Sequence, residues 1–246
     1  MRRVLLGLSL FLVMVPGASR ASTLAASDVL TRARVYLRDQ GVGTNRQQFT
    51  DSTLLQFLSD GQREANAQNW LIQSSFTLTL VGGTTEYIAP LDFMATMRVW
   101  FQAPGQAYLK LDQTSMDQLD AQSAGWTGAT GTPARYYLDR STTSVYLGFY
   151  PAPTSTSTGP VIVYYVQQPA DCTATNCVPF NGNLILQPYV SALAYYVAYR
   201  GFQTVEETDL ANAYLQYWVS FLGIMRQGPT KTPDYNPGFV GQHGSP

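Results

Sequence analysis

Few residues in this chain could do chemistry, and those few are poorly placed for it. The single histidine, His243, is the fourth residue from the C-terminus and lies in a Pro/Gly-rich stretch. Ser-His-Asp and Cys-His catalysis, and zinc sites built on histidine, would all depend on that one side chain. The sequence therefore argues against these catalytic and metal-binding classes.

The glycine-rich and acidic stretches also have plain explanations. Gly125, Gly128 and Gly131 form a glycine-rich loop, but no Lys-Ser/Thr follows, so the phosphate-binding pattern is incomplete. Carboxylates gather at 112–120 and 206–209, and paired carboxylates can act as acid and base. Both groups stand at predicted helix starts, where the helix dipole favours a negative charge by ~0.3–1 kcal/mol. We therefore expect no catalytic residue, no cofactor and no metal.

The two cysteines, Cys172 and Cys177, enclose Thr-Ala-Thr-Asn. Their spacing differs from a redox CxxC motif, and two thiols alone do not make a zinc site. A disulfide between them is expected if the protein is exported, and two inert thiols if it is not. The sequence leaves both states open.

The composition describes a folded, weakly charged protein. Of its 246 residues, 45% are hydrophobic and 13% are charged, against a globular average of ~25% charged. A net charge of −1 and a pI of 5.8 argue against sequence-independent nucleic-acid binding, which needs a concentrated basic surface. Sixteen tyrosines and four tryptophans suit surfaces buried against another protein, although sheet positions also favour them.

The N-terminus has the pattern of a secretory signal. Arginines precede an apolar run at 4–15, and Ser19 and Ala21 have the spacing of a cleavage site. A membrane span needs roughly 20 apolar residues, so the run is too short to cross a bilayer. We interpret residues 1–21 as signal-like, and losing their three arginines would leave a net charge of −1 − 3 = −4. Alternatively, Met14 is the true start.

Apolar residues at helical spacing predict a helical hairpin after this segment. Ser27 is a suitable N-cap for a helix over 28–39, and Thr50 for a second helix over 51–69. A hairpin alone cannot bury its apolar stripe, so it needs a second helical pair.

From residue 75 the apolar period becomes two, which predicts strands. Phe76 and Leu78 alternate with Ser and Thr, and Gly82-Gly83 suggests a tight turn into a returning strand over 85–89. Thr114 and Asp117 form a capping box for a short helix. Further strands are predicted over 95–102, 106–111, 135–139, 144–150 and 160–167.

The helical period resumes near the C-terminus. Pro188 fits the first turn of a helix that runs to Phe202. Thr204 and Glu207 form a capping box for a strongly amphipathic helix that runs to Met225.

The predicted fold class is α+β. Helix pairs at the N- and C-terminal ends form an α-helical bundle, a large antiparallel β-rich region is inserted between them, and an extended tail follows. The predicted segments are a signal-like stretch over 1–21, a helical hairpin over 22–73, the β-rich insertion over 74–183, a helix pair over 184–227 and a Pro/Gly-rich tail over 228–246.

Three stretches in this order resemble the head-to-tail adaptor, or connector, proteins of tailed bacteriophages. The first is Phe49-Thr-Asp-Ser-Thr-Leu-Leu-Gln-Phe-Leu-Ser-Asp-Gly-Gln-Arg-Glu-Ala65. The second is a Gly-x-Pro strand at 131–137, a strand ending in Pro151-Ala-Pro, and a strand with Tyr-Tyr before Pro169. The third is 187–200 followed by 209–223. The resemblance covers about 27–226.

The resemblance implies a non-enzymatic structural protein of the virion, located at the head–tail junction. It implies a ring of twelve copies of the chain, which binds the portal protein and a tail or nozzle protein and lines a channel. Double-stranded DNA would pass through this channel without specific binding, as an acidic balance favours. Tyr235 and Phe239 would anchor the tail of the chain to the portal. The alternative, favoured by the signal-like N-terminus and the cysteine loop, is an exported or periplasmic β-rich binding module with no catalytic activity.

Overall fold

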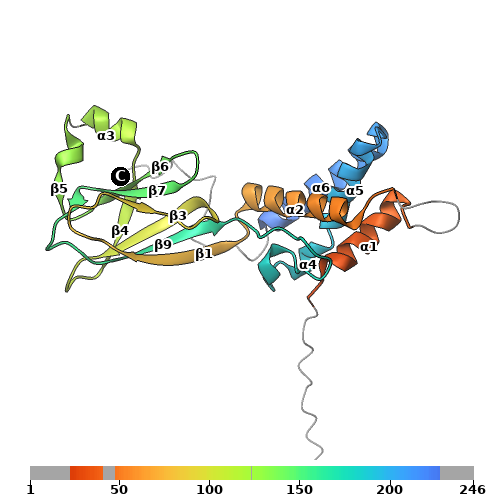
Figure 1. Ribbon diagram of the computed structural model, residues 1–246, viewed down its shortest axis with the longest axis horizontal. Coiled ribbons are helices and arrows are strands. Elements are labelled where there is room, and N and C mark those ends of the chain that lie inside the picture. The colour runs from red at the N-terminus through yellow and green to blue at the C-terminus, as the bar shows by residue number, and fades with distance from the viewer. Residues whose placement is uncertain (1–22, 41–47, 123, 228–246) are drawn as a thin grey trace, which may run out of the picture.

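The computed structural model describes residues 23–40, 48–122 and 124–227, and it has the predicted α+β class. Figure 1 shows the strands gathered at one end of an elongated molecule and most of the helices at the other. The predicted segments 1–21 and 228–246 lie outside the described residues.

The helices come from both ends of the chain and share one apolar core. Val29, Leu58, Val197 and Trp218 all belong to this core, and each comes from a different helix. None of the described helices is both long enough and apolar enough to cross a lipid bilayer. The helices of this end are α1 (Ala26–Leu37), α2 (Asp51–Asn69), α4 (Gln187–Val190), α5 (Leu193–Thr204) and α6 (Thr208–Gln227).

The start of α1 differs from the prediction. Ser27 is not its N-cap, because the helix begins at Ala26, two residues earlier than predicted, and Ala25 is at the N-cap position. The backbone N–H groups of Ala26 and Ser27 donate to the carbonyls of Cys177 and Thr175, each at 2.8 Å. A distant loop thus supplies the acceptors that a capping side chain would have provided. The predicted cap of α2 is confirmed: the Thr50 hydroxyl accepts from the Thr53 N–H at 3.2 Å.

The C-terminal helices also begin and end at other residues than predicted. The single helix expected over 188–202 is divided into α4 and α5, with Ser191 and Ala192 between them. The capping box of Thr204 and Glu207 is wrong, because Thr204 lies inside α5 and its hydroxyl donates to the Arg200 carbonyl at 2.9 Å. Glu206 has a positive φ of 61°, which turns the chain into α6.

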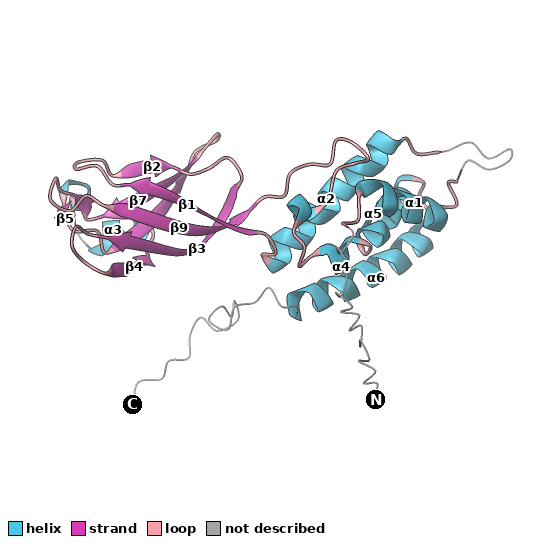
Figure 2. Cartoon of the chain, turned by 90° about the horizontal axis from the view of Figure 1, so that it is seen from below, coloured by secondary structure: helices cyan, strands magenta, loops and turns pink. Residues whose placement is uncertain are grey.

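The strands form a curled sheet with the order β1-β9-β3-β4-β6-β7-β2. Neighbouring strands are antiparallel except at β4 and β6, and a parallel two-stranded sheet of β5 and β8 lies beside it. Figure 2 shows the curl from a second direction. The strands are β1 (Gln73–Thr79), β2 (Glu86–Ile88), β3 (Phe93–Gln102), β4 (Tyr108–Gln113), β5 (Thr130–Gly131), β6 (Arg135–Arg140), β7 (Val145–Tyr150), β8 (Ala152–Pro153) and β9 (Pro160–Gln167).

Two local predictions in this region are wrong. The strands around Gly82-Gly83 do not form a hairpin, because β1 pairs with β9 and β2 pairs with β7. Phe76 of β1 and Tyr87 of β2 instead reach one core from opposite ends of the sheet. The capping box of α3 (Met116–Gln122) is shifted by one residue: Ser115 and Gln118 form it, with bonds of 3.2 and 3.3 Å.

One face of α2 fixes how the β-rich part leaves the helices. The Asn66 side-chain amide donates to the Gln167 carbonyl at 2.8 Å, and its oxygen accepts from the Ile72 N–H at 2.7 Å. Gln62 likewise donates to the Ala170 carbonyl at 2.6 Å. Asn66 and Gln62 are fully buried. Both crossings of the chain between the two parts are therefore tied to the same helix.

Candidate assembly surface on the terminal helices

Helix α6 exposes apolar side chains beside its buried face. No charged residue occurs between Asp209 and Arg226. Trp218 is fully buried against the other helices, yet Tyr217 and Ile224, on a neighbouring face of the helix, are 56% and 50% exposed. Leu210, Tyr217 and Ile224 are seven residues apart and therefore share one face. An apolar helix face is normally buried against a partner, and among the described residues no other element covers these three side chains fully.

A cluster of stacked aromatic rings, the tyrosine cluster, continues this face onto α5 and α1. It consists of Tyr36, Tyr195, Tyr214, Tyr217 and Phe221. The Tyr195 ring is central: its centroid lies 5.4 Å from Tyr36, in a parallel stack, and 5.5 Å from both Tyr217 and Phe221. Tyrosine carries a large apolar area with a polar tip, and it is enriched where proteins meet.

Two glycines let the helices approach closely enough to build the cluster. A Cβ at Gly201 would lie 2.6 Å from a methyl carbon of Leu37, and a Cβ at Gly61 would lie 2.8 Å from the Tyr196 ring. Both distances are too short for real carbon contacts. Glycine at these positions therefore brings α5 against α1 and α2, which fixes the direction of Tyr195.

The tyrosine cluster presents hydroxyl groups without charge. Burial raises the pKa of Tyr36, and the neighbouring Tyr195 hydroxyl raises it further. Burial also raises the pKa of Tyr214, with smaller contributions from Tyr217 and Tyr195. These phenols therefore stay neutral well into the alkaline range, and the surface stays uncharged.

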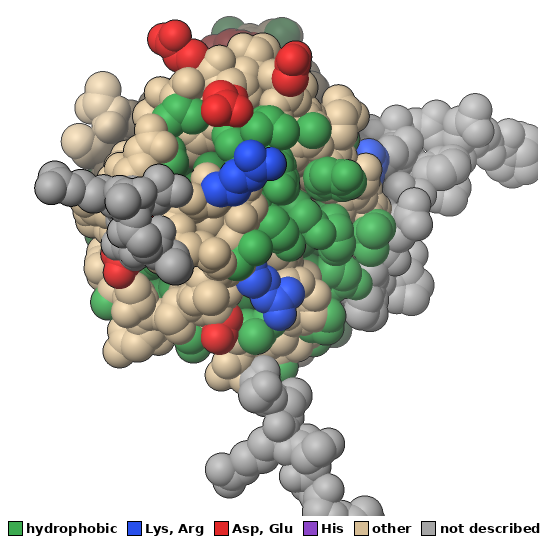
Figure 3. Space-filling model, turned by 90° about the vertical axis from the view of Figure 1, so that its right-hand side faces the viewer, with side chains coloured by type: hydrophobic (Ala, Val, Ile, Leu, Met, Phe, Trp, Pro, Cys, Tyr) green, Lys and Arg blue, Asp and Glu red, His purple; other side chains and the backbone are tan. Residues whose placement is uncertain are grey.

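Figure 3 shows the helical end of the molecule face on. Hydrophobic side chains gather in a connected area, with basic and acidic side chains around and within it. Surfaces that are depleted in charge and rich in aromatic residues are typical of the centre of protein–protein interfaces.

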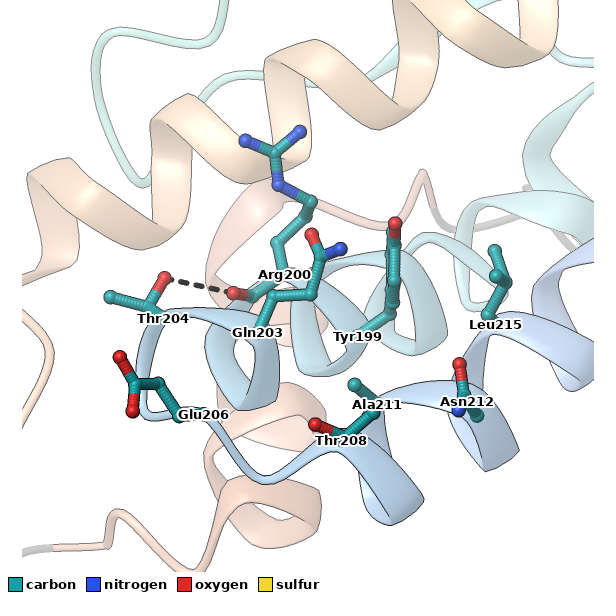
Figure 4. Close-up of a pocket in the computed structure, with 9 residues that line it drawn as sticks. All are labelled: Tyr199, Arg200, Gln203, Thr204, Glu206, Thr208, Ala211, Asn212 and Leu215. Atoms are coloured by element: carbon teal, nitrogen blue, oxygen red, sulfur yellow. Dashed lines mark hydrogen bonds between the residues drawn. The ribbon is translucent and has the colours of Figure 1, made fainter.

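A groove of about 830 Å³ lies where α5 ends and α6 begins (Figure 4). The Arg200 side chain points towards α2, where its guanidinium lies 5.5 Å from the Phe57 ring. It also donates to the hydroxyl of Tyr196, one turn earlier in α5, at 3.3 Å. The lining offers hydroxyl and amide groups that can donate and accept hydrogen bonds. It consists of Tyr199, Arg200, Gln203, Thr204, Glu206, Thr208, Ala211, Asn212 and Leu215.

Comparison with known families identifies the kind of protein that carries this surface. The family model described as "SU10 adaptor protein" matches residues 24–238. The chain belongs to the SU10 adaptor family. The predicted resemblance to phage head-to-tail adaptors is thereby confirmed, and the match extends beyond the predicted 27–226 at both ends. The family implies a structural role in the phage particle. No curated protein matches the chain.

The residues that the sequence singled out have different positions in this adaptor-family chain. Tyr235 and Phe239, the predicted portal anchor, lie outside the described residues. Cys172 and Cys177 are joined by a disulfide, and the loop that it closes supplies the carbonyls at the start of α1. The disulfide therefore closes a loop that packs against the start of α1.

Sequence reasoning missed the polar residues of α2 that hold the two parts of the adaptor together. Ser59, Gln62 and Asn66 are buried, and they follow one another at intervals of three and four residues. Polar residues at helical spacing beside an apolar stripe, here Leu58 and Ala65, are the signal that could have found them.

Proposed function

We propose that this protein is a head-to-tail adaptor that forms a ring between the portal and the tail of a phage particle. The resemblance to adaptors implies twelve subunits. Membership of the SU10 adaptor family supports the structural role. The observation that carries the ring is the exposed, uncharged face of α6 with the tyrosine cluster beside it.

The α6 face is suited to contact a second copy of the chain. We infer that the helix pairs from the two ends act as one bundle and present this face outwards. In a ring, a neighbouring copy would meet the apolar Leu210, Tyr217 and Ile224 with a different surface. Such a contact is head-to-tail. Repeated contacts of this kind close into a ring when the rotation allows it. A stable contact needs about 800 Å² on each partner, which a helix of this length can supply together with its neighbours.

The charge of the chain suits a channel for DNA. The net charge is −1, and it would be −4 without residues 1–21. An acidic ring would repel the phosphate backbone and let double-stranded DNA pass without specific binding. The ring would thus lie at the head–tail junction of the virion, between the portal protein and a tail or nozzle protein.

The C-terminal tail is proposed as the arm that contacts the portal. Residues 228–246 contain Pro229, Pro233 and Pro237 and only two charged residues, so their sequence favours no regular helix. Prolines reduce the entropy that an extended arm loses on binding. Tyr235 and Phe239 would then anchor it in a groove of the portal.

Native mass spectrometry and negative-stain microscopy of the full chain, alone and with the portal protein of the same phage, test the ring. We expect closed rings in at least one of the two conditions. Ile224→Asp places a charge on the α6 face, outside the tyrosine cluster, and should prevent ring formation without lowering the thermal midpoint. Leu91→Asp, at a leucine that is 94% exposed in the β-rich part, is the matched control and should form rings. A strict monomer in both conditions contradicts the proposal.

Removing residues 228–246 tests the portal arm separately. The shortened chain should form rings with an unchanged thermal midpoint but fail to retain the portal in a pull-down. Tyr235→Ala with Phe239→Ala should have the same effect in the full chain. Retention of the portal by both variants would show that the arm is not the anchor.

A further inference from the structure

Strand β1 forms a free edge of the large sheet. It pairs with β9 without interruption, from Gln73 opposite Val166 to Thr79 opposite Pro160. Among the described residues, no strand pairs with its other side. Figure 1 shows β1 beside β9 at the border of the sheet, and Figure 2 shows the same pair in the curled sheet from below.

The register determines which backbone groups point away from the sheet. The Gln167 N–H donates to the Ile72 carbonyl, and the Leu80 N–H donates to the Gly159 carbonyl, both at 2.9 Å. Hydrogen-bonding direction alternates along an antiparallel strand, so the even-numbered residues of β1 bond to β9. The N–H and C=O groups of the odd-numbered residues therefore point outwards. These residues, which are all solvent-exposed, are Gln73, Ser75, Thr77 and Thr79.

The β1 edge lacks the features that normally keep an edge strand from pairing. Proteins protect such edges with charged side chains, prolines, bulges or very short strands. No charged residue and no proline occurs between Glu64 and Glu86, and the register of β1 with β9 shows no bulge.

The other free edges of the same sheet do have such protection. Strand β2 has only three residues and is followed closely by Pro90. The first half of β4, which β6 leaves unpaired, carries Lys110. The contrast within one sheet indicates that the bare edge of β1 is covered in the working assembly.

The inner side of β1 also has room for a cover. Phe76 and Leu78 point into the sheet core but are only partly buried. A strand added beside β1 would bury the rest of both side chains while its backbone satisfied the outward N–H and C=O groups. Main-chain pairing with pockets for alternate side chains is how extended peptides bind sheet edges.

We propose that the β1 edge binds an extended segment of a different protein of the phage particle, which adds a strand to the sheet. A second copy of this chain does not fit. Pairing of β1 with β1 is isologous, so it joins only two copies and cannot continue around a ring. The other free edges are also unsuitable partners, because β2 is too short and the first half of β4 is charged. This proposal rests on the proposed ring only where it excludes a second copy as the partner. The segment that fits is proline-free over about seven residues and free of charge where it pairs with β1.

Hydrogen–deuterium exchange tests the free edge and its cover. In the isolated full-length protein, the amides of Ser75 and Thr77 should exchange fast, while those of Phe76 and Leu78 exchange slowly. In assembled phage particles, the Ser75 and Thr77 amides should exchange at least about tenfold more slowly, because they then donate to a partner strand. Unchanged fast exchange in the particle would overturn the proposal. Protection that already exists in rings of this chain alone would also overturn it, because it would show pairing between copies.

A photo-crosslinker at position 77 identifies the partner in the same particles. We expect crosslinks to one segment of a different chain, and none from a crosslinker at the exposed Thr142, in the turn between β6 and β7. Crosslinks from position 77 to this chain itself would refute the proposal. Failure to form rings at all would contradict the proposed function, but the crosslinks from position 77 would still test whether the β1 edge binds another protein.

Substitutions at Thr77 separate the edge from the fold. Because the Thr77 N–H points to solvent, Thr77→Pro removes an outward donor without breaking the pairing with β9. Thr77→Lys keeps the donor but places a charge on the edge. Both should lower incorporation into particles by about tenfold or more, the loss expected from one weakened strand contact. Thr77→Val keeps the N–H and should be incorporated within about twofold of the unmodified chain. Equal incorporation of all three variants would contradict the proposal.

Discussion

The two ends of the molecule expose different groups to their surroundings. At the helical end the backbone is hydrogen-bonded within the helices, and what is exposed is apolar side chain, such as Tyr217 and Ile224. At the β-rich end the exposed side chains of β1 are polar, and its outward backbone N–H and C=O groups have no partner strand among the described residues. A side-chain surface selects a partner by shape, whereas a strand edge selects an extended backbone. One chain can therefore engage two kinds of partner without competition between them.

The two ends also differ in which parts of the sequence form them. The helical core joins α1 and α2 to α5 and α6, from opposite ends of the sequence. The sheet is formed from the continuous stretch between them. They meet at the buried amides of α2, so that changes on either side of this junction should have separable effects.

The largest effect is expected from the buried side of α6. Trp218 is fully buried, and its indole N–H donates to the Glu64 carboxylate at 3.2 Å. Trp218→Ala should lower the free energy of unfolding by about 4 kcal/mol, because it removes a large core side chain and leaves a cavity. Ile224→Ala, on the exposed face of the same helix, should cost less than ~1 kcal/mol. Urea denaturation of both variants measures the difference, and equal losses would mean that α6 does not have one buried and one exposed side.

The next effect concerns the junction between the two ends. Asn66→Ala removes the partners of the Ile72 N–H and the Gln167 carbonyl, and should cost about 3 kcal/mol for two unsatisfied buried groups. Gln68→Ala, on the exposed side of the same helix, is the matched control and should cost less than ~0.5 kcal/mol. Hydrogen exchange should show faster opening at Ile72 and Gln167 in the first variant only. No change there would show that the junction is held by other contacts.

The sequence predicted the positions of the helices and strands better than which of them pair or pack together. The period of apolar residues located α2 and most strands, and the cap at Thr50 followed from local chemistry. The hairpin at Gly82-Gly83 failed because pairing of β1 with β9 joins residues that are far apart in the chain. Likewise, the start of α1 depends on carbonyls of a distant loop, which no local pattern encodes.

The candidate surfaces were predictable to a similar extent. The tyrosine-rich, weakly charged composition indicated a surface buried against another protein, but not which helix carries it. Which side of α6 remains exposed, and which edge of the sheet remains open, depends on tertiary packing. The close approach at Gly201 illustrates this, because its partner Leu37 belongs to the opposite end of the chain.

Alkaline titration should distinguish the β-rich end through its buried phenol. Burial raises the pKa of Tyr136 to about 12, with the nearby Thr96 hydroxyl opposing the shift and the Asp112 carboxylate adding to it. An unfolded tyrosine has a pKa near ~10, so the unfolded state loses its proton first. This contribution to stability is therefore complete below pH ~10 and is lost between pH ~10 and ~12, by about 2.5 kcal/mol.

Stability curves of the unmodified chain and of Tyr136→Phe check this pH dependence. The variant should lose less stability over the same range. Part of the loss should remain, because burial and the nearby Glu86 also raise the pKa of Tyr137. Identical pH dependence of the two proteins would contradict the assignment to Tyr136.

The disulfide should contribute a smaller amount at the helical end. Replacing both Cys172 and Cys177 by Ser opens a short ring and should cost about 2 kcal/mol in the loop-entropy model. Reduction of the unmodified chain with dithiothreitol should give the same loss, and the double variant should not respond to it. Thiol labelling with mass spectrometry should find free thiols in protein taken from a reducing cytosol. A reduced protein with unchanged stability would show that the bond does not hold the loop against α1.

The smallest effect is expected from the ion pairs on the outside of the junction. Arg63 donates to Asp171 at 2.9 Å and to Asp60 at 3.1 Å, but its side chain is 37% exposed. Exposed ion pairs gain little, because water screens the charges and ordering the side chains costs entropy. Arg63→Ala should therefore change the free energy of unfolding by no more than ~0.5 kcal/mol, and 0.5 M salt should remove the difference. Asn66 connects α2 to the last residue of β9, and Arg63 connects it to Asp171 just beyond. The two variants therefore compare a buried amide with an exposed charge at one place. If Arg63→Ala cost as much as Asn66→Ala, the two ends of the molecule would be held together by charge and not by buried hydrogen bonds.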